Sequence, residues 1–452
     1  MIAHLYRLVA SRWRMGLLGY RGEALELLSR FGVEVGDRVE VELEEGKLKG
    51  VLMPRYELAD DVHLVLKLDN GYNVGIRVGR VRRIKRLEGA RRPGFARPKV
   101  ERREGLPRVS IIGTGGTIAS RIDYRTGGVY PVFTPEELYG LVPGLSDYAT
   151  IETDPLFNIL SENVRVEHWK GLALKIGEKV REGYHGVVVT HGTDTMGYTA
   201  AAMSFSLRGI PIPVALVGAQ RSSDRPSSDA ASNLLGAVRF VSTSDAAGVY
   251  VVMHAGMGDG LLVVHRGTKV RKNHTSRRDA FESVNVPPVA YIREDGIEFL
   301  SEVPRRGGGE FEVRPEFERK VALLKFHPEF DPAIIDLLVD EGYRGLVLEG
   351  TGLGHVGTYV HGSIRRALKE GLLVGMTSQC IWGRVWMTVY ETGRDLLSMG
   401  VLPLGDMLPE TALVKMMWVL ANSEGPEEAK RLMLTNLAGE YSPRSPLRRR
   451  LG

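Results

Sequence analysis

Four short, almost entirely apolar segments constrain the fold of this chain most strongly. They read "RVSIIG", "GVVVT", "PVALVG" and "GVYVVM", and helical patterns separate them. A strand that is buried on both faces shows such a continuous apolar run, so the pattern predicts an α/β fold with a parallel sheet. Each segment leads into a polar or glycine-rich loop, and the predicted strand ends are Gly113, Thr190, Gly218 and His254. Ligands bind beyond the carboxyl ends of such strands, so we expect the chemistry at this edge.

A different pattern precedes this region. Residues 35–87 show short alternating runs, and the pair Asn70-Gly71 between two of them is a strong hairpin signal. They predict a small all-β barrel, preceded by one amphipathic helix over Gly22–Phe31. Residues 89–106 are rich in Pro, Gly and charge without periodicity, which is typical of a linker.

A second α/β region follows another break. The segments "KVALLKFH", "GLVLEG" and "LLVGMT" alternate with predicted helices near residues 332–341 and 363–370, and helices continue to about Ala438. The 452 residues exceed one ordinary core. We therefore expect six parts, which are an N-terminal helix and barrel (1–88), a linker (89–106), a larger α/β domain (107–305), a linker (306–318), a smaller α/β domain (319–442) and a basic tail (443–452).

Composition narrows the class of protein. A hydrophobic fraction of 43% with 25% charged residues excludes a disordered chain. The sequence holds no apolar run near the ~20 residues of a membrane span and no clean signal peptide, so we expect a cytoplasmic protein. The single cysteine, Cys380, has no partner for an internal disulfide. We interpret it as a buried structural thiol, with a nucleophile in "SQCIWG" as the alternative.

The net charge of +5 does not by itself indicate a nucleic-acid-binding protein. Basic residues gather in three places, which are Arg80, Arg82, Arg83, Lys85 and Arg86, then residues 91–103, then the tail "PRSPLRRRLG". Each group is consistent with a solvated surface, and together they are consistent with weak attraction to an RNA backbone.

The loop "IIGTGGTIAS" (111–120) has three interpretations. A dinucleotide fingerprint needs Gly or Ala at its third position, where this chain has Ile118. Glu136 and Glu137 lie in a segment that looks helical, so they do not supply the acidic residue expected after a second strand. The phosphate-binding interpretation is therefore disfavoured, and a purely structural tight turn or a nucleophile-bearing loop remains.

A second loop favours the nucleophile. "VVVTHGTDTMGYTAA" places Thr193 and Asp194 beyond an apolar strand, at the predicted N-terminal turn of a helix, where free N–H groups stabilise an oxyanion. The alternative is that one of them only caps the helix. A hydroxyl nucleophile needs a base, and no G-x-S-x-G motif is present. A lysine of "HRGTKVRKNHTSRRDAFESVN" can serve, and the residues alone do not separate Lys269 from Lys272.

Three segments together carry a family resemblance. "TGGTIAS", "HGTDTM" and "VRKNHTSRRDAFESVN" resemble the bacterial and archaeal L-asparaginase and glutaminase family, over roughly residues 107–443. The resemblance implies a larger and a smaller α/β domain and hydrolysis of side-chain amides through threonine. It implies no metal and no organic cofactor in this chain.

The resemblance also assigns roles to residues. Thr117 becomes the first candidate for the nucleophile, although the family leaves open which threonine attacks. Thr193, Asp194 and Lys272 form a second group, with Lys272 as base and Asp194 also holding the substrate's α-ammonium. The remaining implied residues are Tyr130 (or nearby Tyr124) assisting the first threonine, Ser161 on the substrate carboxylate, and Gly116 and Gly192 beside the substrate.

The N-terminal segment adds a second resemblance. "VGDRVEVELEEGKLKGVLMPRYELADDVHLVLKLDNGYNVGI" resembles the N-terminal domain of the D subunits of archaeal glutamyl-tRNA(Gln) amidotransferases, which extends the likeness to about Gly19. It implies a glutaminase whose partner, the E subunit of the amidotransferase, activates the glutamyl group on tRNA(Gln) with ATP and Mg²⁺. It also implies a homodimer of this chain within a two-plus-two heterotetramer. Residues 1–14 fall outside the likeness, so Met15 is an alternative start.

Two other functions stay open from the sequence. One is a stand-alone L-asparaginase that carries an accessory barrel. The other is an RNA-binding scaffold whose amidase site is inactive, and the intact Thr117, Thr193, Asp194 and Lys272 argue against it.

Overall fold

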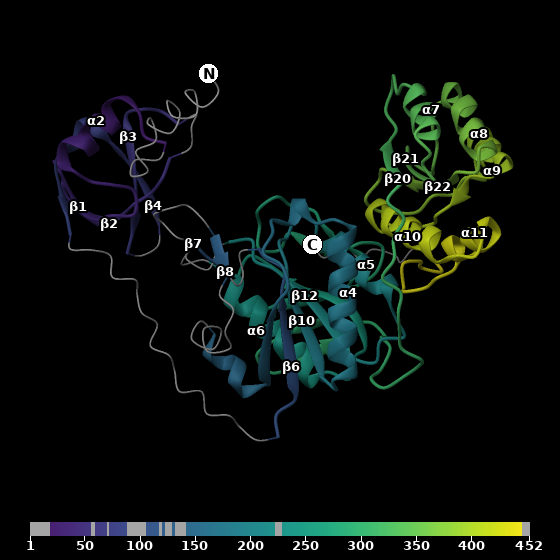
Figure 1. Ribbon diagram of the computed structural model, residues 1–452, viewed down its shortest axis with the longest axis horizontal. Coiled ribbons are helices and arrows are strands. Elements are labelled where there is room, and N and C mark those ends of the chain that lie inside the picture. Colours follow the sequence, from purple (N-terminus) through teal and green to yellow (C-terminus); the bar gives the residue numbers. More distant parts are fainter. Residues whose placement is uncertain are drawn as a thin grey trace, which may run out of the picture.

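The architecture comes from a computed structural model, which describes residues 19–55, 59–69, 72–87, 105–116, 120–122, 129–131, 142–221 and 228–444. Of residues 120–122, 129–131 and 143 only the backbone is described. Three folded units follow one another along the chain (Figure 1). The predicted hairpin turn at Asn70-Gly71, and Thr117 and Tyr124, lie outside the described residues.

The first unit is a curled antiparallel sheet with one helix. Its elements are α2 (Gly22–Phe31), β1 (Arg38–Leu43), β2 (Gly46–Leu52), β3 (His63–Leu68), β4 (Asn73–Arg77), the 3₁₀ turn η1 (Val78–Arg80) and β5 (Val81–Arg86). The strand order is β4-β3-β2-β1-β5. The predicted helix is confirmed at both ends, because Gly32, at φ 63°, closes it by donating to the carbonyls of Leu28 and Ser29. The predicted hairpin is confirmed by the pairing of β3 with β4.

The second unit is built on an eight-stranded sheet. Its strands are β6 (Arg108–Gly113), β9 (Thr150–Pro155), β10 (Gly186–Thr190), β12 (Pro213–Val217), β13 (Gly248–His254), β14 (Leu262–Arg266), β17 (Ala290–Ile292) and β18 (Ile297–Phe299). The four predicted apolar strands are β6, β10, β12 and β13, and they run parallel beside β9. β14, β17 and β18 extend the sheet in antiparallel fashion. The parallel core of the sheet is thus confirmed, and β12 ends one residue before the predicted Gly218.

Helices cover both faces of this sheet (Figure 1). They are α4 (Val166–Arg181), α5 (Met196–Ser206) and α6 (Ala230–Thr243), with the 3₁₀ turns η2 (Pro143–Asp147) and η3 (Ser161–Asn163). α4 and α5 share one apolar cluster, and α6 lies in a separate cluster on the opposite face. Both clusters take alternate residues from the same strands, which explains why those strands are apolar throughout.

The third unit is a smaller parallel sheet in the order β20-β21-β22-β23. Its elements are β20 (Val321–Lys325), α7 (Ala333–Asp340), β21 (Gly345–Gly350), η4 (Thr358–Val360), α8 (His361–Lys369), β22 (Leu373–Ser378), α9 (Glu391–Met399), β23 (Leu402–Pro403), α10 (Pro409–Asn422) and α11 (Pro426–Leu434). The predicted helices near 332–341 and 363–370 correspond to α7 and α8. Three short strand pairs complete the fold, which are β7 (Ser120–Ile122) with β8 (Val129–Pro131), β11 (Leu207–Arg208) with β19 (Glu312–Val313), and β15 (Val270–Lys272) with β16 (Phe281–Ser283).

Helix α10 joins the two α/β units. It packs on β20 and β21 and also against α5 of the larger unit, so one apolar cluster crosses the boundary. The Phe205 ring lies 6.3 Å from the Trp418 ring, centroid to centroid. The Trp418 indole N–H also donates to the carbonyl of Arg314 at 3.0 Å. The two units are therefore packed as one body along this helix.

The structure corrects the interpretation of Cys380. Its thiol is free and exposed, so a buried structural thiol is wrong. Cys380 lies beyond the end of β22, where its N–H donates to the Ser378 hydroxyl at 3.1 Å. In the described part of the chain, no helix combines the length and the apolar character that crossing a membrane requires.

One buried histidine should make the stability of the fold depend on pH. His265 on β14 is 2% exposed, bonds to the Ser283 hydroxyl through Nδ1 at 2.8 Å, and has a pKa that burial lowers to about 3. The unfolded pKa is about 6.5, so its contribution is complete above that pH and is lost as the pH falls towards 3. Between pH 7 and pH 4.5 the loss should be about 2 to 3 kcal/mol. Urea unfolding followed by tryptophan fluorescence should show that the free energy of unfolding of His265→Asn changes by about 2 to 3 kcal/mol less than that of the wild type between pH 7 and pH 4.5. Equal changes in the two proteins would contradict the prediction.

Candidate active site

The two threonine-rich loops leave the sheet side by side. β6 and β10 are parallel neighbours, and Gly113 pairs with Thr190 at their carboxyl ends. Immediately beyond, Thr114 donates both its N–H (3.1 Å) and its hydroxyl (2.8 Å) to the Thr190 carbonyl. The register of the sheet therefore brings the two loops together.

Glycines allow the loops to touch. Gly115 has φ 109°, and a Cβ there would lie 2.2 Å from the Ile159 carbonyl oxygen. Gly116 has φ 83°, and its Cβ would lie 2.7 Å from the Gly192 nitrogen. A Cβ on Gly192 would in turn lie 2.8 Å from the Ser161 Cβ and Oγ. Residues with a side chain would not fit contacts this close, so Gly116, Gly192 and Ser161 pack tightly together. We call these three residues the glycine floor.

A threonine, a lysine and an aspartate form a polar group on this floor. Lys272 Nζ donates to Thr193 Oγ1 at 2.8 Å and to Asp194 Oδ1 at 2.8 Å. The Lys272 side chain is 14% exposed, whereas the Asp194 side chain is 68% exposed. The Lys272 side chain is therefore largely shielded from solvent, whereas the Asp194 carboxylate is accessible to a ligand.

The structure separates the two lysines that the residue pattern alone left open, of which the family resemblance assigns Lys272 as base. Lys272 ends β15 and lies against the Thr193 loop. Lys269 is fully buried, and its ammonium pairs with Asp406 Oδ2 of the smaller unit at 2.8 Å. Of these two, Lys272 is therefore the one in position to exchange a proton with a loop hydroxyl.

The start of α5 differs from the prediction. The sequence places Thr193 and Asp194 in the first turn, but the helix begins at Met196 with Thr195 as N-cap, and no side chain makes the capping bond. The Thr195 hydroxyl instead donates to the Ser161 carbonyl at 2.7 Å. The capping interpretation is therefore wrong, because the hydroxyl and the carboxylate of Thr193 and Asp194 both bind Lys272. The first-turn N–H groups of α5 still carry the positive end of the helix dipole.

A buried histidine supports the same loop from behind. His191 bonds to the Gly192 carbonyl through Nδ1 (2.7 Å) and to the Thr199 hydroxyl through Nε2 (2.9 Å). The Trp169 indole N–H donates to that same hydroxyl at 3.1 Å. Burial lowers the pKa of His191, so the ring is neutral, with its proton on Nδ1 and Nε2 accepting from Thr199. This chain of hydrogen bonds holds the "HGTDT" backbone in place.

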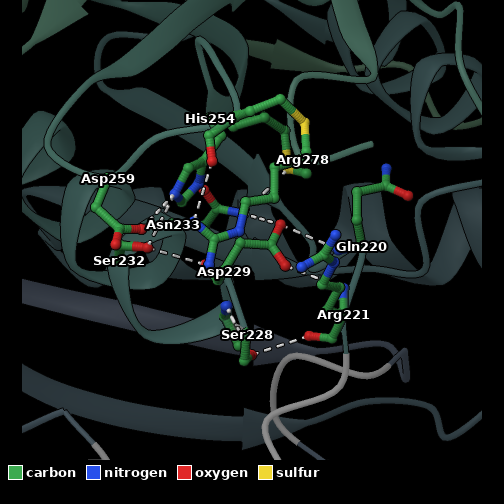
Figure 2. Close-up of polar contacts among 12 residues, drawn as sticks. Gln220, Arg221, Ser228, Asp229, Ser232, Asn233, His254, Asp259 and Arg278 are labelled. Atoms are coloured by element: carbon green, nitrogen blue, oxygen red, sulfur yellow. Dashed lines mark hydrogen bonds and ion pairs between the residues drawn. The ribbon is translucent and has the colours of Figure 1, made fainter. Parts of the chain in front are cut away.

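A second polar network, which the sequence reasoning missed, shapes the neighbouring loop after β12 (Figure 2). Both carboxylate oxygens of buried Asp229 accept backbone N–H groups, from Gln220 and Arg221, at 3.0 Å each. Asn233 donates to Asp229 (2.9 Å) and to the Gly218 carbonyl (2.9 Å). A Cβ on Gly218 would lie 2.8 Å from the Thr193 methyl, so this loop borders the site.

The network continues to the loops after β13 and β15. His254 Nδ1 bonds to Asn233 Oδ1 at 2.6 Å, and the buried Arg278 guanidinium donates to Asp259 at 2.6 Å (Figure 2). His254 Nε2 lies 3.9 Å from that same Asp259 carboxylate. The sequence identifies His254 only as the end of a strand. Its partner Asn233 lies 21 residues away, in helix α6, so no local sequence signal indicates the network.

The other predicted residues are placed as follows. Ser161 is buried in η3 beside Gly192. The backbone of Tyr130 lies in β8 opposite Arg121, and its side chain lies outside the described residues, as does Thr117. Across the described ranges, no group of three or more His, Cys, Asp or Glu side chains is arranged to hold a metal ion.

The glycine floor gives a testable prediction. Gly116→Ala should lower the rate of the amide hydrolysis that the sequence leads us to expect by tenfold or more, because its Cβ would force the loop of residues 113–116 away from Gly192. Gly183→Ala is the matched control, since Gly183 also has positive φ (75°) but nothing lies within 4 Å of its Cβ, so only backbone strain of about 1 kcal/mol is expected. Steady-state kinetics and thermal unfolding of both variants test this. Equal activity of the two variants would contradict it.

Comparisons with known proteins agree with this fold. Three family descriptions match the chain, which are "Asparaginase, N-terminal" over residues 108–305, "Glutaminase/Asparaginase C-terminal domain" over 320–433 and "GatD N-terminal domain" over 33–87. Among solved structures, the thermostable L-asparaginase from Thermococcus kodakarensis is 34% identical with a TM-score of 0.67, covering 74% of this chain and 99% of its own. A probable cytoplasmic L-asparaginase from Campylobacter jejuni is 29% identical with a TM-score of 0.62, covering 73% and 100%.

Curated relatives match almost end to end. The D subunit of the glutamyl-tRNA(Gln) amidotransferase of Pyrococcus abyssi is 54% identical over 430 residues, covering 92% of this chain and 97% of the relative. The corresponding D subunit of Methanopyrus kandleri is 50% identical over 432 residues, covering 93% and 94%. With an asparaginase-type fold and the additional N-terminal domain both present, this chain belongs to the family of glutamyl-tRNA(Gln) amidotransferase D subunits.

Proposed function

We propose that this chain is the amidase subunit of a glutamyl-tRNA(Gln) amidotransferase. It hydrolyses the side-chain amide of glutamine, or of asparagine, and releases ammonia, which a partner subunit uses to convert Glu-tRNA(Gln) to Gln-tRNA(Gln). The observation that carries the proposal is the contact of Lys272 Nζ with both Thr193 Oγ1 and Asp194 Oδ1, beside the loop that leads into Thr117. The D-subunit relatives supply the amidotransferase context.

Catalysis proceeds in two steps. In the first, the Thr117 oxygen attacks the amide carbonyl carbon, its proton passes to the leaving nitrogen, and loss of ammonia from the tetrahedral intermediate leaves a threonyl ester. In the second, water attacks that ester, the acid product is released, and the free Thr117 hydroxyl is regenerated. The covalent intermediate divides one difficult displacement into two easier ones. Each step passes through an oxyanion, which we expect backbone N–H groups of the two loops to stabilise.

The group around Lys272 serves the proton transfers. Thr193 relays a proton between the water or amide nitrogen and Lys272 Nζ, which lies 2.8 Å from its oxygen. Asp194 orients the lysine through Oδ1 and, being largely exposed, also receives the α-ammonium of the substrate. Ser161 binds the α-carboxylate from the floor beside Gly192. No metal or organic cofactor takes part in this chain.

The N-terminal sheet distinguishes this proposal from a stand-alone asparaginase. The solved asparaginases are covered over 99% and 100% of their own lengths but span only 74% and 73% of this chain. The additional residues include the segment 33–87, which matches the GatD N-terminal domain. An added domain of this kind has no role in amide hydrolysis itself, so we assign it to assembly with the partner.

The same sheet does not present a strong site for RNA. Its predicted basic group is largely paired with carboxylates, through Arg80 with Glu45 (2.5 Å), Arg82 with Glu44 (3.4 Å) and Arg86 with Asp37 (2.8 Å). Carboxylates beside these arginines lower the positive potential that a phosphate backbone would meet at this surface. We therefore propose that the E subunit holds most of the tRNA(Gln), together with ATP and Mg²⁺. We further propose, from the family resemblance, that this chain is a homodimer in a two-plus-two heterotetramer.

The role of the lysine group is tested by isosteric substitution. Thr193→Val removes the hydroxyl and keeps the shape, so kcat for glutamine should fall by about 100-fold or more. In Lys272→Met, kcat should fall by a similar factor. In Thr193→Ser, which keeps the hydroxyl, kcat should stay within tenfold of the wild-type value. Ammonia release measures all three, and a Thr193→Val variant with unchanged kcat would refute the assigned role.

The amidotransferase context is tested with the reconstituted complex. We expect slow ammonia release from glutamine by this chain alone and at least tenfold faster release with the E subunit, ATP, Mg²⁺ and Glu-tRNA(Gln). Asparagine is compared in parallel, and Thr117→Ala, which should be inactive in both settings, is the blank. Fast release by the chain alone, unaltered by partner and tRNA, would indicate a stand-alone amidohydrolase instead.

A further inference from the structure

The strand that carries Lys272 belongs to the larger unit but is fastened to the smaller one. We define the lysine hairpin as residues 269–285, which contain β15, β16 and their connection. At its base, Lys269 Nζ pairs with Asp406 Oδ2 at 2.8 Å, and both side chains are fully buried. Lys269 Nζ also donates to the Asp406 carbonyl at 2.9 Å. Burial raises the pKa of Asp406, but the Lys269 ammonium and the Ser442 N–H together hold that pKa below its usual value.

The other strand of the hairpin is fastened at its end. Asn285 Nδ2 donates to the Gly383 carbonyl at 2.9 Å, and the Gly383 N–H donates back to Asn285 Oδ1 at 2.8 Å. Asn285 has φ 63°, a conformation that Asn tolerates better than other residues with a side chain. The Val284 N–H bonds to the Lys269 carbonyl at 2.8 Å, so the two fastening points are joined across the hairpin base.

A third contact lies next to the catalytic lysine. Arg271 Nε lies 3.2 Å from Glu410 Oε1, in the first turn of α10. Lys269, Arg271 and Asn285 thus contact two segments of the smaller unit, residues 406–410 and Gly383, and Lys272 lies between Arg271 and Asn285 in sequence. Strand residues rise about 3.3 Å each, so Lys272 lies about 10 Å along the chain from Lys269.

The contacts that Lys272 makes orient its ammonium but do not hold the backbone that carries it. Both are side-chain contacts at Nζ, and one of the partners, Asp194, is itself largely solvent-exposed. Proton transfer needs the donor and acceptor held within about half an ångström. The backbone beneath Lys272 therefore has to supply the precision, and that backbone is held by the smaller unit.

We infer that Lys269, Asp406 and Asn285 are positioning residues of the amidase reaction, through which the smaller unit sets the place of Lys272 Nζ. The inference rests on the proposed role of Lys272. A shift of the smaller unit relative to the larger one displaces Lys272 from Thr193 and slows proton transfer, while the substrate-binding floor of Gly116, Gly192 and Ser161 is unchanged. The signature is a loss of kcat with little change in KM.

The chain offers a matched control. Lys415 on α10 pairs with Glu440 at 2.6 Å, and both side chains are fully buried, as in the Lys269–Asp406 pair. Lys415 also donates to the carbonyls of Met433 and Thr435, both within the smaller unit. Breaking either pair leaves one buried charge without its partner, so both changes destabilise the fold. Only the Lys269–Asp406 pair includes a residue of the lysine hairpin.

The experiment compares Lys269→Met, Asn285→Gly and Lys415→Met in the full chain, with the E subunit and Glu-tRNA(Gln) added where the wild type needs them. Asn285→Gly removes the carboxamide and keeps the positive φ, so it should fold even if Lys269→Met does not. We expect Lys269→Met and Asn285→Gly to lower kcat for glutamine at least tenfold with KM within twofold. Lys415→Met should lower the unfolding temperature and keep kcat within twofold, and Lys269→Arg, which keeps the charge, should regain most of the kcat.

Each outcome decides one of the two proposals. Wild-type kcat in Asn285→Gly overturns the positioning role, as does an equal loss in Lys415→Met. If Lys272→Met is inactive while both hairpin variants match the wild type, this inference fails and the proposed function stands. If Lys272→Met retains activity, the proposed role of the lysine fails, and the inference falls with it.

Discussion

The hydrogen-bonded register between β6 and β10 is the constraint on which the candidate site depends. Because the two strands are parallel neighbours in register, with Gly113 opposite Thr190, their following loops emerge from the same edge at the same height. Thr114 then joins the loops through two bonds to one carbonyl. The glycine floor and the Thr193 hydroxyl, which we propose face the substrate, both follow these strand ends in the chain or pack against the loops beyond them.

The polar chemistry of the site is carried by residues from distant parts of the chain. Thr193 and Lys272 are 79 residues apart, and the fastening of the lysine hairpin reaches Asp406, 137 residues from Lys269. Helix α10 supports this arrangement because it lies in one apolar cluster with α5, the helix that follows the Thr193 loop. The two α/β units are thus not independent modules at the site. One supplies the loops, and the other restrains the strand that bears the lysine.

Particular residues show how far sequence reasoning reaches. The helix Gly22–Phe31 is predicted with the ends that the structure shows, because its apolar spacing and the following glycine are both local signals. The capping hypothesis for Thr193 and Asp194 is wrong, because a lysine 78 or 79 residues away competes for both side chains. Cys380 has apolar neighbours that suggest burial, but it follows the end of β22 at the surface. The Asp229–Asn233–His254 network has no local signature at all.

The sequence by itself determined the continuously apolar strands β6, β10, β12 and β13, the loops that end them and the family, because apolar periodicity and short motifs are properties of adjacent residues. The residue pattern left Lys269 and Lys272 as equivalent candidates three positions apart, and the family resemblance selected Lys272. Only the tertiary structure shows the physical basis of that choice, because it buries Lys269 against Asp406 and places Lys272 beside Thr193. The physical reason is that a lysine acquires its role from the charge and the hydroxyl placed beside its ammonium, and those partners are brought there by strand order and domain packing.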